Sequence, residues 1–332
     1  MANKFIKWSL LSLAILLAGG LVFIYGILPG KVAQGILVKA QVRKPLDRSP
    51  KDDGFKYQDV SFMTPDSVSI SGWWMVPASK KILGTVLLSH GVFKNRDQVL
   101  SRAEFLVKKG YQVLLFDHRG NGLSGDSPVS GGYLESRDYL GAVSFLQSKK
   151  ELHKPLVFFG FSLGAMSALR AAAQSPDVDA VIADSPLANI RSYVSRRTMG
   201  GAFAFLPGFL GRCLSEYDEA TGLALTVEDM DLIPVVGQLQ DKPVLYFTGE
   251  GDDLAKSEEV RQLFAKTPSH QKRLIYIQDA GHEETYVKSP IIYEKSVLGF
   301  LTDLRNGFPE PKDLAELEGK EKKRGSVTPR NR

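Results

Sequence analysis

Cysteine and histidine are scarce in this chain of 332 residues, which has one cysteine, Cys213, and five histidines. A single cysteine excludes an intrachain disulfide and every metal site built from several thiolates. The histidines lack HExxH or similar ligand spacing, so the sequence predicts no metal. An excess of one charge is also missing, because 37 acidic residues nearly balance 42 basic ones. Basic and aromatic residues do not alternate as in nucleic-acid-binding proteins, and we expect no nucleic-acid partner.

Charged side chains are absent from residues 8–28, which are rich in Leu, Ile, Ala, Val and Phe. About 20 helical residues cross a bilayer core, and aromatic residues stand near both ends of the run, where the membrane interface is expected. A cleaved signal peptide is the alternative, but its apolar region is typically about 7–15 residues long. We therefore expect a single-pass signal anchor at 8–28 after a tail at 1–7. Basic residues on its two sides nearly balance, with a small preference for an extracytoplasmic main domain.

Short apolar runs alternate with helical segments between residues 56 and 305. The runs 57–62 and 68–76 predict antiparallel strands at one edge. The continuous runs that predict buried parallel strands are 84–89, 111–116, 155–159, 179–183, 243–248 and 273–277. Helices are expected at 97–109, 134–149, 163–174 and 290–304. This alternation predicts an α/β domain, in which helices cover both faces of a mostly parallel sheet and ligands bind at the carboxyl ends of the strands.

Three further segments flank or interrupt this domain. Residues 29–55 mix Lys, Arg, Asp and Pro and predict a stalk. Residues 186–241 are too many for a direct connection between the fourth and fifth parallel strands, so we expect a small helical insertion over the site. Its apolar part, 202–210, would line a substrate pocket, touch a membrane or pack on the domain. Residues 306–332 are charged and proline-containing, which predicts a disordered tail.

Residues 160–164 read Gly-Phe-Ser-Leu-Gly and lie between an expected strand and an expected helix. In this context a G-x-S-x-G sequence is typical of a nucleophile elbow, whose sharp turn holds the serine in a strained backbone conformation. Gly160 and Gly164 leave the space that such a turn requires. An ordinary structural serine is the alternative, but the flanking strand and helix favour Ser162 as a nucleophile.

A serine hydroxyl needs a base to take its proton. His282 follows the last expected strand and so reaches the same sheet edge as Ser162, whereas the other four histidines are less well placed. A carboxylate must in turn orient the imidazole, and the preceding strand is followed by Glu250, Asp252 and Asp253. We choose Asp252 and keep Asp253 and Glu250 as alternatives. The chain order is then Ser, Asp, His.

An oxyanion formed at Ser162 needs backbone donors. The N–H of Leu163, at the start of a helix, is one candidate. The loop after the first buried strand reads Ser-His-Gly-Val-Phe, and we expect the second donor to be the N–H of Val92, with that of Phe93 as the alternative. His90 in this loop is expected to order the loop rather than to act as a base.

Five motifs together resemble the α/β-hydrolase superfamily over about residues 56–305. They are HGVFKNR at 90–96, DHRGNGLSG at 117–125, GFSLG at 160–164, GEGDD at 249–253 and AGHEE at 280–284. The segment SISGWWMVP at 69–77 resembles a branch that includes membrane-anchored Bem46-like and ABHD-type hydrolases. The resemblance implies an α/β-hydrolase fold, with Ser162 as nucleophile, Asp252 as acid and His282 as base. The family's small apolar residue and proline after the acid are missing here, which keeps Asp253 open.

These residues predict a serine hydrolase that cleaves an ester or thioester through an acyl-serine intermediate. No cofactor is implied, because the three side chains suffice for this chemistry. A lipid-like acyl group is the expected substrate, in view of the membrane segment and the apolar insertion. A serine peptidase of the same fold is the alternative, followed by a binding protein without catalytic activity.

Overall fold

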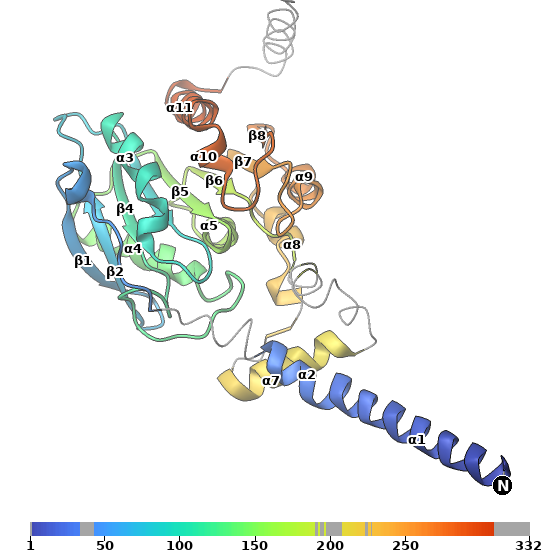
Figure 1. The fold of residues 1–332 in the computed structure, drawn as a ribbon. Coiled ribbons are helices and arrows are strands. Elements are labelled where there is room, and N and C mark those ends of the chain that lie inside the picture. Colours follow the sequence, from blue (N-terminus) through green and yellow to red (C-terminus); the bar gives the residue numbers. More distant parts are fainter. Residues whose placement is uncertain are drawn as a thin grey trace, which may run out of the picture.

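The computed structural model describes residues 2–33, 43–189, 192, 196, 208–222, 225–226 and 228–308. Its centre is an eight-stranded sheet with the strand order β1-β2-β4-β3-β5-β6-β7-β8 (Figure 1). The strands are β1 Gln58–Met63, β2 Ser69–Met75, β3 Thr85–Ser89, β4 Gln112–Phe116, β5 Leu156–Phe161, β6 Ala180–Asp184, β7 Val244–Gly249 and β8 Lys272–Ile277. The eight expected strands are therefore present, with bounds that differ by one or two residues.

Parallel pairing aligns the carboxyl ends of six strands at one edge of the sheet. β1 and β2 are antiparallel, as are β2 and β4, whereas every pair from β4 to β8 is parallel. The register sets Ser89 opposite Gly160 and Phe161 opposite Asp184. The last residues of β3, β5 and β6 therefore lie side by side, where the sequence predicts the reacting groups.

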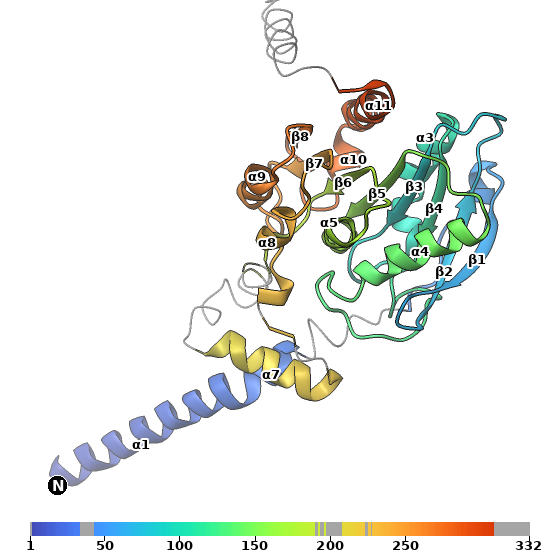
Figure 2. The same ribbon diagram turned by 180° about the vertical axis from the view of Figure 1, so that it is seen from behind.

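Helices cover both faces of the sheet, as Figures 1 and 2 show. The core on one face includes α4 Ser136–Ser148, α5 Leu163–Gln174 and α9 Ser257–Lys266, and the core on the other includes α3 Leu100–Lys108 and α11 Pro290–Asn306. The short helix α10 Thr285–Lys288 precedes α11. α9 was not among the expected helices. The expected helix at 97–109 begins as a 3-10 turn, Arg96–Val99, because the Asn95 side chain accepts the N–H of Asp97.

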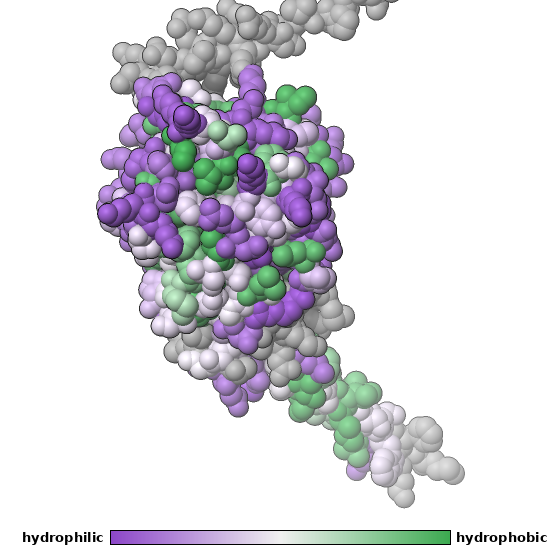
Figure 3. Space-filling model, turned by 90° about the vertical axis from the view of Figure 1, so that its left-hand side faces the viewer, coloured by the Kyte–Doolittle hydropathy of each residue, from purple (hydrophilic) through white to green (hydrophobic). Residues whose placement is uncertain are grey.

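An apolar helical arm leaves the domain at the amino-terminal end. It consists of α1 Ala2–Val22, a π-helical turn Phe23–Ile27 and α2 Leu28–Val32. Residues 6–32 are long and apolar enough to cross a membrane, and the apolar window has no buried share within the chain. Figure 3 shows hydrophobic side chains along this arm, whereas the face of the domain in view is largely hydrophilic. The arm is thus a candidate membrane span or signal sequence.

Two of the flanking segments pack on the domain. In the expected stalk, Leu46 and Phe55 join the core on the α3 face, and the Asn95 side chain donates to the backbone oxygen of Pro45 at 2.9 Å. The insertion contains α7 Phe209–Thr221 and α8 Ile233–Val236. Most of the apolar stretch 202–210 and the tail from 309 onward lie outside the described residues.

Candidate active site

The backbone at Ser162 turns sharply between β5 and α5. Its φ of 52° and ψ of −113° lie in a region that residues with a side chain rarely adopt. The Ser162 N–H donates to the backbone oxygen of Asp184 at 2.8 Å, which ties the turn to β6. Such strain persists only where the surroundings hold it, and it gathers at functional sites.

Glycines on both sides of Ser162 make this turn possible. A Cβ atom at Gly160 would lie 2.1 Å from the carbonyl carbon and oxygen of Gly164. A Cβ atom at Gly164 would lie 2.4 Å from the Ser89 hydroxyl and 2.6 Å from its backbone oxygen. Because both distances are far inside van der Waals contact, the strand and helix approach each other only when both positions lack a side chain.

The structure brings Ser162, His282 and Asp252 together. Ser162 Oγ lies 2.8 Å from His282 Nε2, and His282 Nδ1 lies 2.8 Å from Asp252 Oδ2. An ionised carboxylate only accepts hydrogen bonds, so Nδ1 carries the proton and Nε2 is free to accept the serine proton. Ser162 is 2% exposed and the His282 side chain 15% exposed, and the Asp252 side chain is buried. This is an arrangement in which a base can activate a hydroxyl.

The two other candidate acids stand apart from His282. Asp252 Oδ1 accepts the backbone N–H groups of Leu254 and Ala255 at 2.8 and 2.7 Å, which leaves Oδ2 for the imidazole. The Asp253 side chain is 94% exposed and pairs with Lys256 at 2.7 Å, and this pairing lowers the pKa of Asp253. Glu250 is exposed, and its backbone N–H pairs with β8.

Asp184, which no motif in the sequence indicates, connects the turn at Ser162 with the loop that carries His282. Its buried carboxylate accepts from Thr285 Oγ1 and from Arg102 at 2.9 Å, and from the Tyr293 hydroxyl at 2.7 Å. Thr285 follows His282 by three residues, so this network holds the histidine loop. The signal in the sequence is an aspartate at the end of an apolar strand, where reacting groups gather.

The loop after β3 lies beside Ser162. A Cβ atom at Gly91 would lie 3.3 Å from the Ser162 Cβ, and the backbone oxygen of His90 accepts the N–H of Gly164 at 3.1 Å. His90 Nε2 accepts the backbone N–H of His118 at 3.0 Å, so its proton is on Nδ1, which lies 2.6 Å from the Gly91 oxygen. Burial, together with the neighbouring His118, lowers the pKa of His90 well below its usual value. His90 thus orders the loop as a neutral side chain.

Both predicted oxyanion donors belong to residues near Ser162. Val92, Phe93 and Leu163 pack together with Val129 in a small apolar cluster. Leu163 is the first residue of α5, so its N–H has no partner within the helix and carries part of the positive end of the helix dipole. Phe93 has a positive φ of 62°, which adds a second strained residue at this edge.

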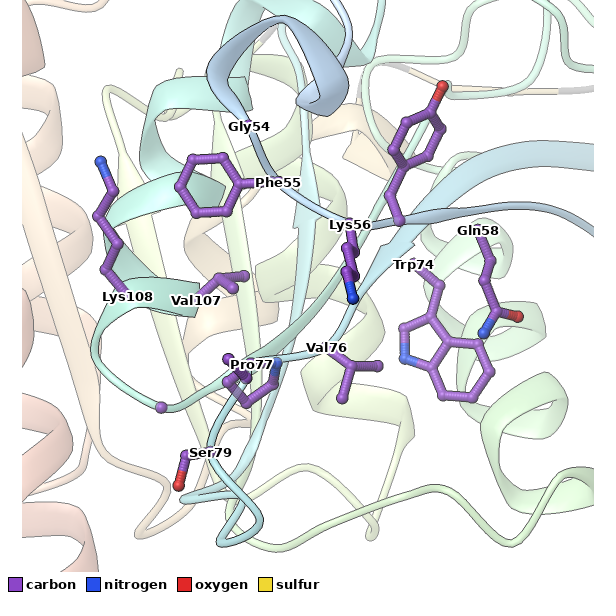
Figure 4. A pocket seen from close by; sticks show the side chains of 13 residues that line it. Gly54, Phe55, Lys56, Gln58, Trp74, Val76, Pro77, Ser79, Val107 and Lys108 are labelled. Carbon is purple, nitrogen blue, oxygen red and sulfur yellow. The ribbon is translucent and has the colours of Figure 1, made fainter.

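A cavity of about 710 Å³ lies at the opposite end of the sheet. Ser79 and Gly110 in its wall precede β3 and β4, whereas Ser162 follows the carboxyl end of β5. Figure 4 shows Lys56 and Trp74 among its lining side chains. This cavity is therefore separate from the site around Ser162. Among the described residues, no three His, Cys, Asp or Glu side chains are grouped so that they could hold a metal ion.

The mostly parallel sheet, the helices on both faces and the strained serine turn after β5 define an α/β-hydrolase fold. A family model described as "Serine aminopeptidase, S33" matches residues 80–224. The esterase Pf2001 of Pyrococcus furiosus is similar in structure, with a TM-score of 0.65 and 29% identity over 79% of this chain and 98% of that one.

Two curated proteins are similar over most of their length. The uncharacterized protein YqkD of Bacillus subtilis is 27% identical over 255 residues, which are 75% of this chain and 81% of YqkD. The uncharacterized membrane protein YNL320W of Saccharomyces cerevisiae is 23% identical over 246 residues, which are 72% of this chain and 78% of that protein. The chain belongs to the α/β-hydrolase superfamily.

Proposed function

We propose that the protein is a serine hydrolase that cleaves a carboxylic ester or thioester. The observation that carries this proposal is the continuous hydrogen-bonded chain from Ser162 through His282 to Asp252, which begins on a strained turn. The likeness to an archaeal esterase at 29% identity supports an ester as substrate. Cleavage of an ester by these three residues requires only proton transfer, nucleophilic attack and electrostatic stabilisation.

In the first step His282 Nε2 takes the hydroxyl proton of Ser162 while Oγ attacks the carbonyl carbon. The carbonyl oxygen becomes an oxyanion, which the N–H groups of Leu163 and Val92 stabilise. His282 then donates its proton to the leaving oxygen or sulfur, and the acyl group stays on Ser162. Asp252 stabilises the imidazolium throughout this step.

In the second step water takes the place of the leaving group. His282 accepts a proton from the water, whose oxygen attacks the acyl carbon of the ester on Ser162. Collapse of the second oxyanion releases the carboxylic acid and returns the proton to Ser162. Because the negative charge forms on the same carbonyl oxygen in both steps, one pair of backbone donors serves both.

A single-pass membrane attachment through residues 8–28 completes the proposal, with the hydrolase domain on the extracytoplasmic side. The apolar arm and the likeness to a yeast membrane protein support the attachment. They also favour the membrane-anchored Bem46-like branch and a lipid-like acyl substrate. A reporter fused to the carboxyl terminus and probed with a membrane-impermeant label tests the orientation, because labelling of intact cells requires an extracytoplasmic domain.

Replacement of Ser162 tests the central claim. Ser162→Ala should abolish labelling by a fluorophosphonate probe, whereas Ser144→Ala, at an exposed serine of α4, should label like the wild type. Undiminished labelling of Ser162→Ala would overturn the proposal. A wild type that does not react would instead support a non-catalytic binding protein.

A serine peptidase is the second candidate, because the matching family model carries an aminopeptidase description. It would use the same three side chains with an amine as leaving group. Rates with p-nitrophenyl esters of increasing chain length, compared with aminoacyl p-nitroanilides, separate the two. Faster cleavage of the anilides at equal concentration would replace the esterase proposal with the peptidase.

A further inference from the structure

The helix α7 of the insertion packs against the end of the apolar arm. α2 and α7 are in contact, and Figures 1 and 2 both show α7 lying across α2 at the base of α1. A Cβ atom at Gly30 would lie 3.1 Å from the Glu216 carboxylate, so the Glu216 side chain of α7 lies against the backbone of α2. Val32 and Ala33 are buried, as is Tyr217 on α7, and all three belong to one hydrophobic cluster. The end of the arm therefore packs against the insertion.

The same helix reaches a loop beside Ser162. The buried Tyr217 hydroxyl donates to the backbone oxygen of Val129 at 2.7 Å. The loop that carries Val129 is itself ordered, because the Glu135 carboxylate accepts the N–H groups of Ser130 and Gly132, both at 2.9 Å. Tyr217 is thus a polar link between α7 and this loop.

Val129 in turn contacts the segment that supplies the predicted oxyanion donors. Val129 and Leu163 are both nearly fully buried and pack together with Val92 and Phe93. A shift of the Val129 loop would leave a gap against Leu163, and cores of native density do not tolerate such gaps without a movement of their neighbours. A movement of α7 would therefore shift the backbone N–H groups of Leu163 and Val92.

We propose that α7 couples the membrane arm to the oxyanion donors, with Tyr217 as a positioning residue, so that the hydrolase works at full rate only when the arm is correctly seated. This inference rests on the proposed function. Ser162 is only 2% exposed, so a substrate reaches it when the surrounding loops part. A membrane-seated α2 would hold α7, and through Tyr217 the Val129 loop, while the substrate enters.

Two variants of the full-length protein in phospholipid vesicles test the coupling from its two ends. Tyr217→Phe keeps the ring and removes the hydroxyl, with its hydrogen bond to Val129 and its contact with the Thr221 side chain. Ala33→Asp buries a carboxylate at the end of the arm, far from the reacting groups in sequence. The matched controls are Ser215→Ala on the exposed side of α7 and Lys31→Ala on the exposed side of α2.

The assay is hydrolysis of p-nitrophenyl butyrate, with kcat expressed per site titrated by a fluorophosphonate so that unfolded molecules are not counted. Tyr217→Phe should lower kcat roughly three- to tenfold, the range expected for loss of one hydrogen bond. Ala33→Asp should lower kcat as well, and both variants should keep KM within twofold of the wild type. The inhibition constant of an alkyl boronic acid, which forms an oxyanion-like adduct at the serine, should rise by the same factor. The controls should keep the wild-type values.

The outcomes separate this inference from the proposed function. A wild type that no fluorophosphonate labels overturns both. A reactive wild type with an unchanged kcat and boronate inhibition in Tyr217→Phe overturns the coupling alone. If Ala33→Asp does not fold, as judged by its thermal unfolding, Tyr217→Phe decides the question by itself.

Discussion

Replacement of Asp252 by asparagine should reduce kcat about 10⁴-fold, the loss typical of a triad whose histidine is held in the wrong tautomer. The structure gives the reason atom by atom. Asp252 Oδ1 accepts two backbone N–H groups, from Leu254 and Ala255, whereas Oδ2 accepts from His282. In Asp252→Asn the amide oxygen stays with the two N–H groups, so the amide NH₂ turns towards His282 Nδ1.

An NH₂ group facing Nδ1 requires that this nitrogen lose its proton, which moves to Nε2. Nε2 then donates towards Ser162 Oγ instead of accepting from it, and the serine has no base. A 10⁴-fold loss corresponds to about 5.5 kcal/mol of transition-state stabilisation. Because Oδ1 keeps both of its donors, the thermal unfolding midpoint should change little.

The assay is p-nitrophenyl butyrate hydrolysis, with the extent of fluorophosphonate labelling as a second readout. Asp253→Asn is the matched control, because the Asp253 side chain is 94% exposed and pairs with Lys256. We expect its kcat to stay within about twofold of the wild type. A large loss in Asp253→Asn, or more than a tenth of the activity left in Asp252→Asn, would refute the reasoning.

Three other perturbations test the fold around the site. Gly160→Ala should abolish soluble folded protein, since its Cβ would lie 2.1 Å from the next turn; a wild-type melting curve would contradict this. Arg102→Met should lower the free energy of unfolding by about 3–5 kcal/mol, because the buried Asp184 loses its ion pair, and a chemical denaturation midpoint near that of the wild type would disprove it. Burial, with a hydrogen bond to Asp53, raises the pKa of Glu104 to about 7. Its protonated form therefore stabilises the fold fully below about pH 4.5, and this stability is lost as the pH rises through 7. Glu104→Gln should raise the melting temperature at pH 8 more than at pH 5, and an equal shift at both pH values would exclude this assignment.

Local sterics and periodicity explain why so much of the fold was predictable. Continuous apolar runs between helical segments leave few alternatives to a parallel sheet. The glycines around Ser162 report a close backbone approach that a sequence can reveal, because no other residue fits there. The predicted first and last residues of the strands were less accurate. The end of a strand depends on its pairing with the neighbouring strand rather than on the side chain of its last residue.

The choice between Asp252 and Asp253 shows where sequence reasoning ends. Both carboxylates follow the same strand, and one step along the chain turns a side chain from the core to the solvent. The backbone N–H groups of Leu254 and Ala255 donate to Asp252 Oδ1 in a tight turn, which leaves Asp252 Oδ2 beside His282. That turn arises from the three-dimensional path of the loop, for which the residues DDLA carry no distinctive signal.

The role of Asp184 was beyond sequence reasoning for a different reason. Its backbone oxygen accepts the N–H of Ser162 and its carboxylate accepts the hydroxyl of Thr285, three residues beyond His282. One buried residue thus sets the distance between the nucleophile turn and the histidine loop, which are 120 residues apart. Arg102, on the helix α3, neutralises the negative charge of the Asp184 carboxylate. A network whose members come from four separate segments has no local pattern, so only the folded chain reveals that His282 and Ser162 share one support.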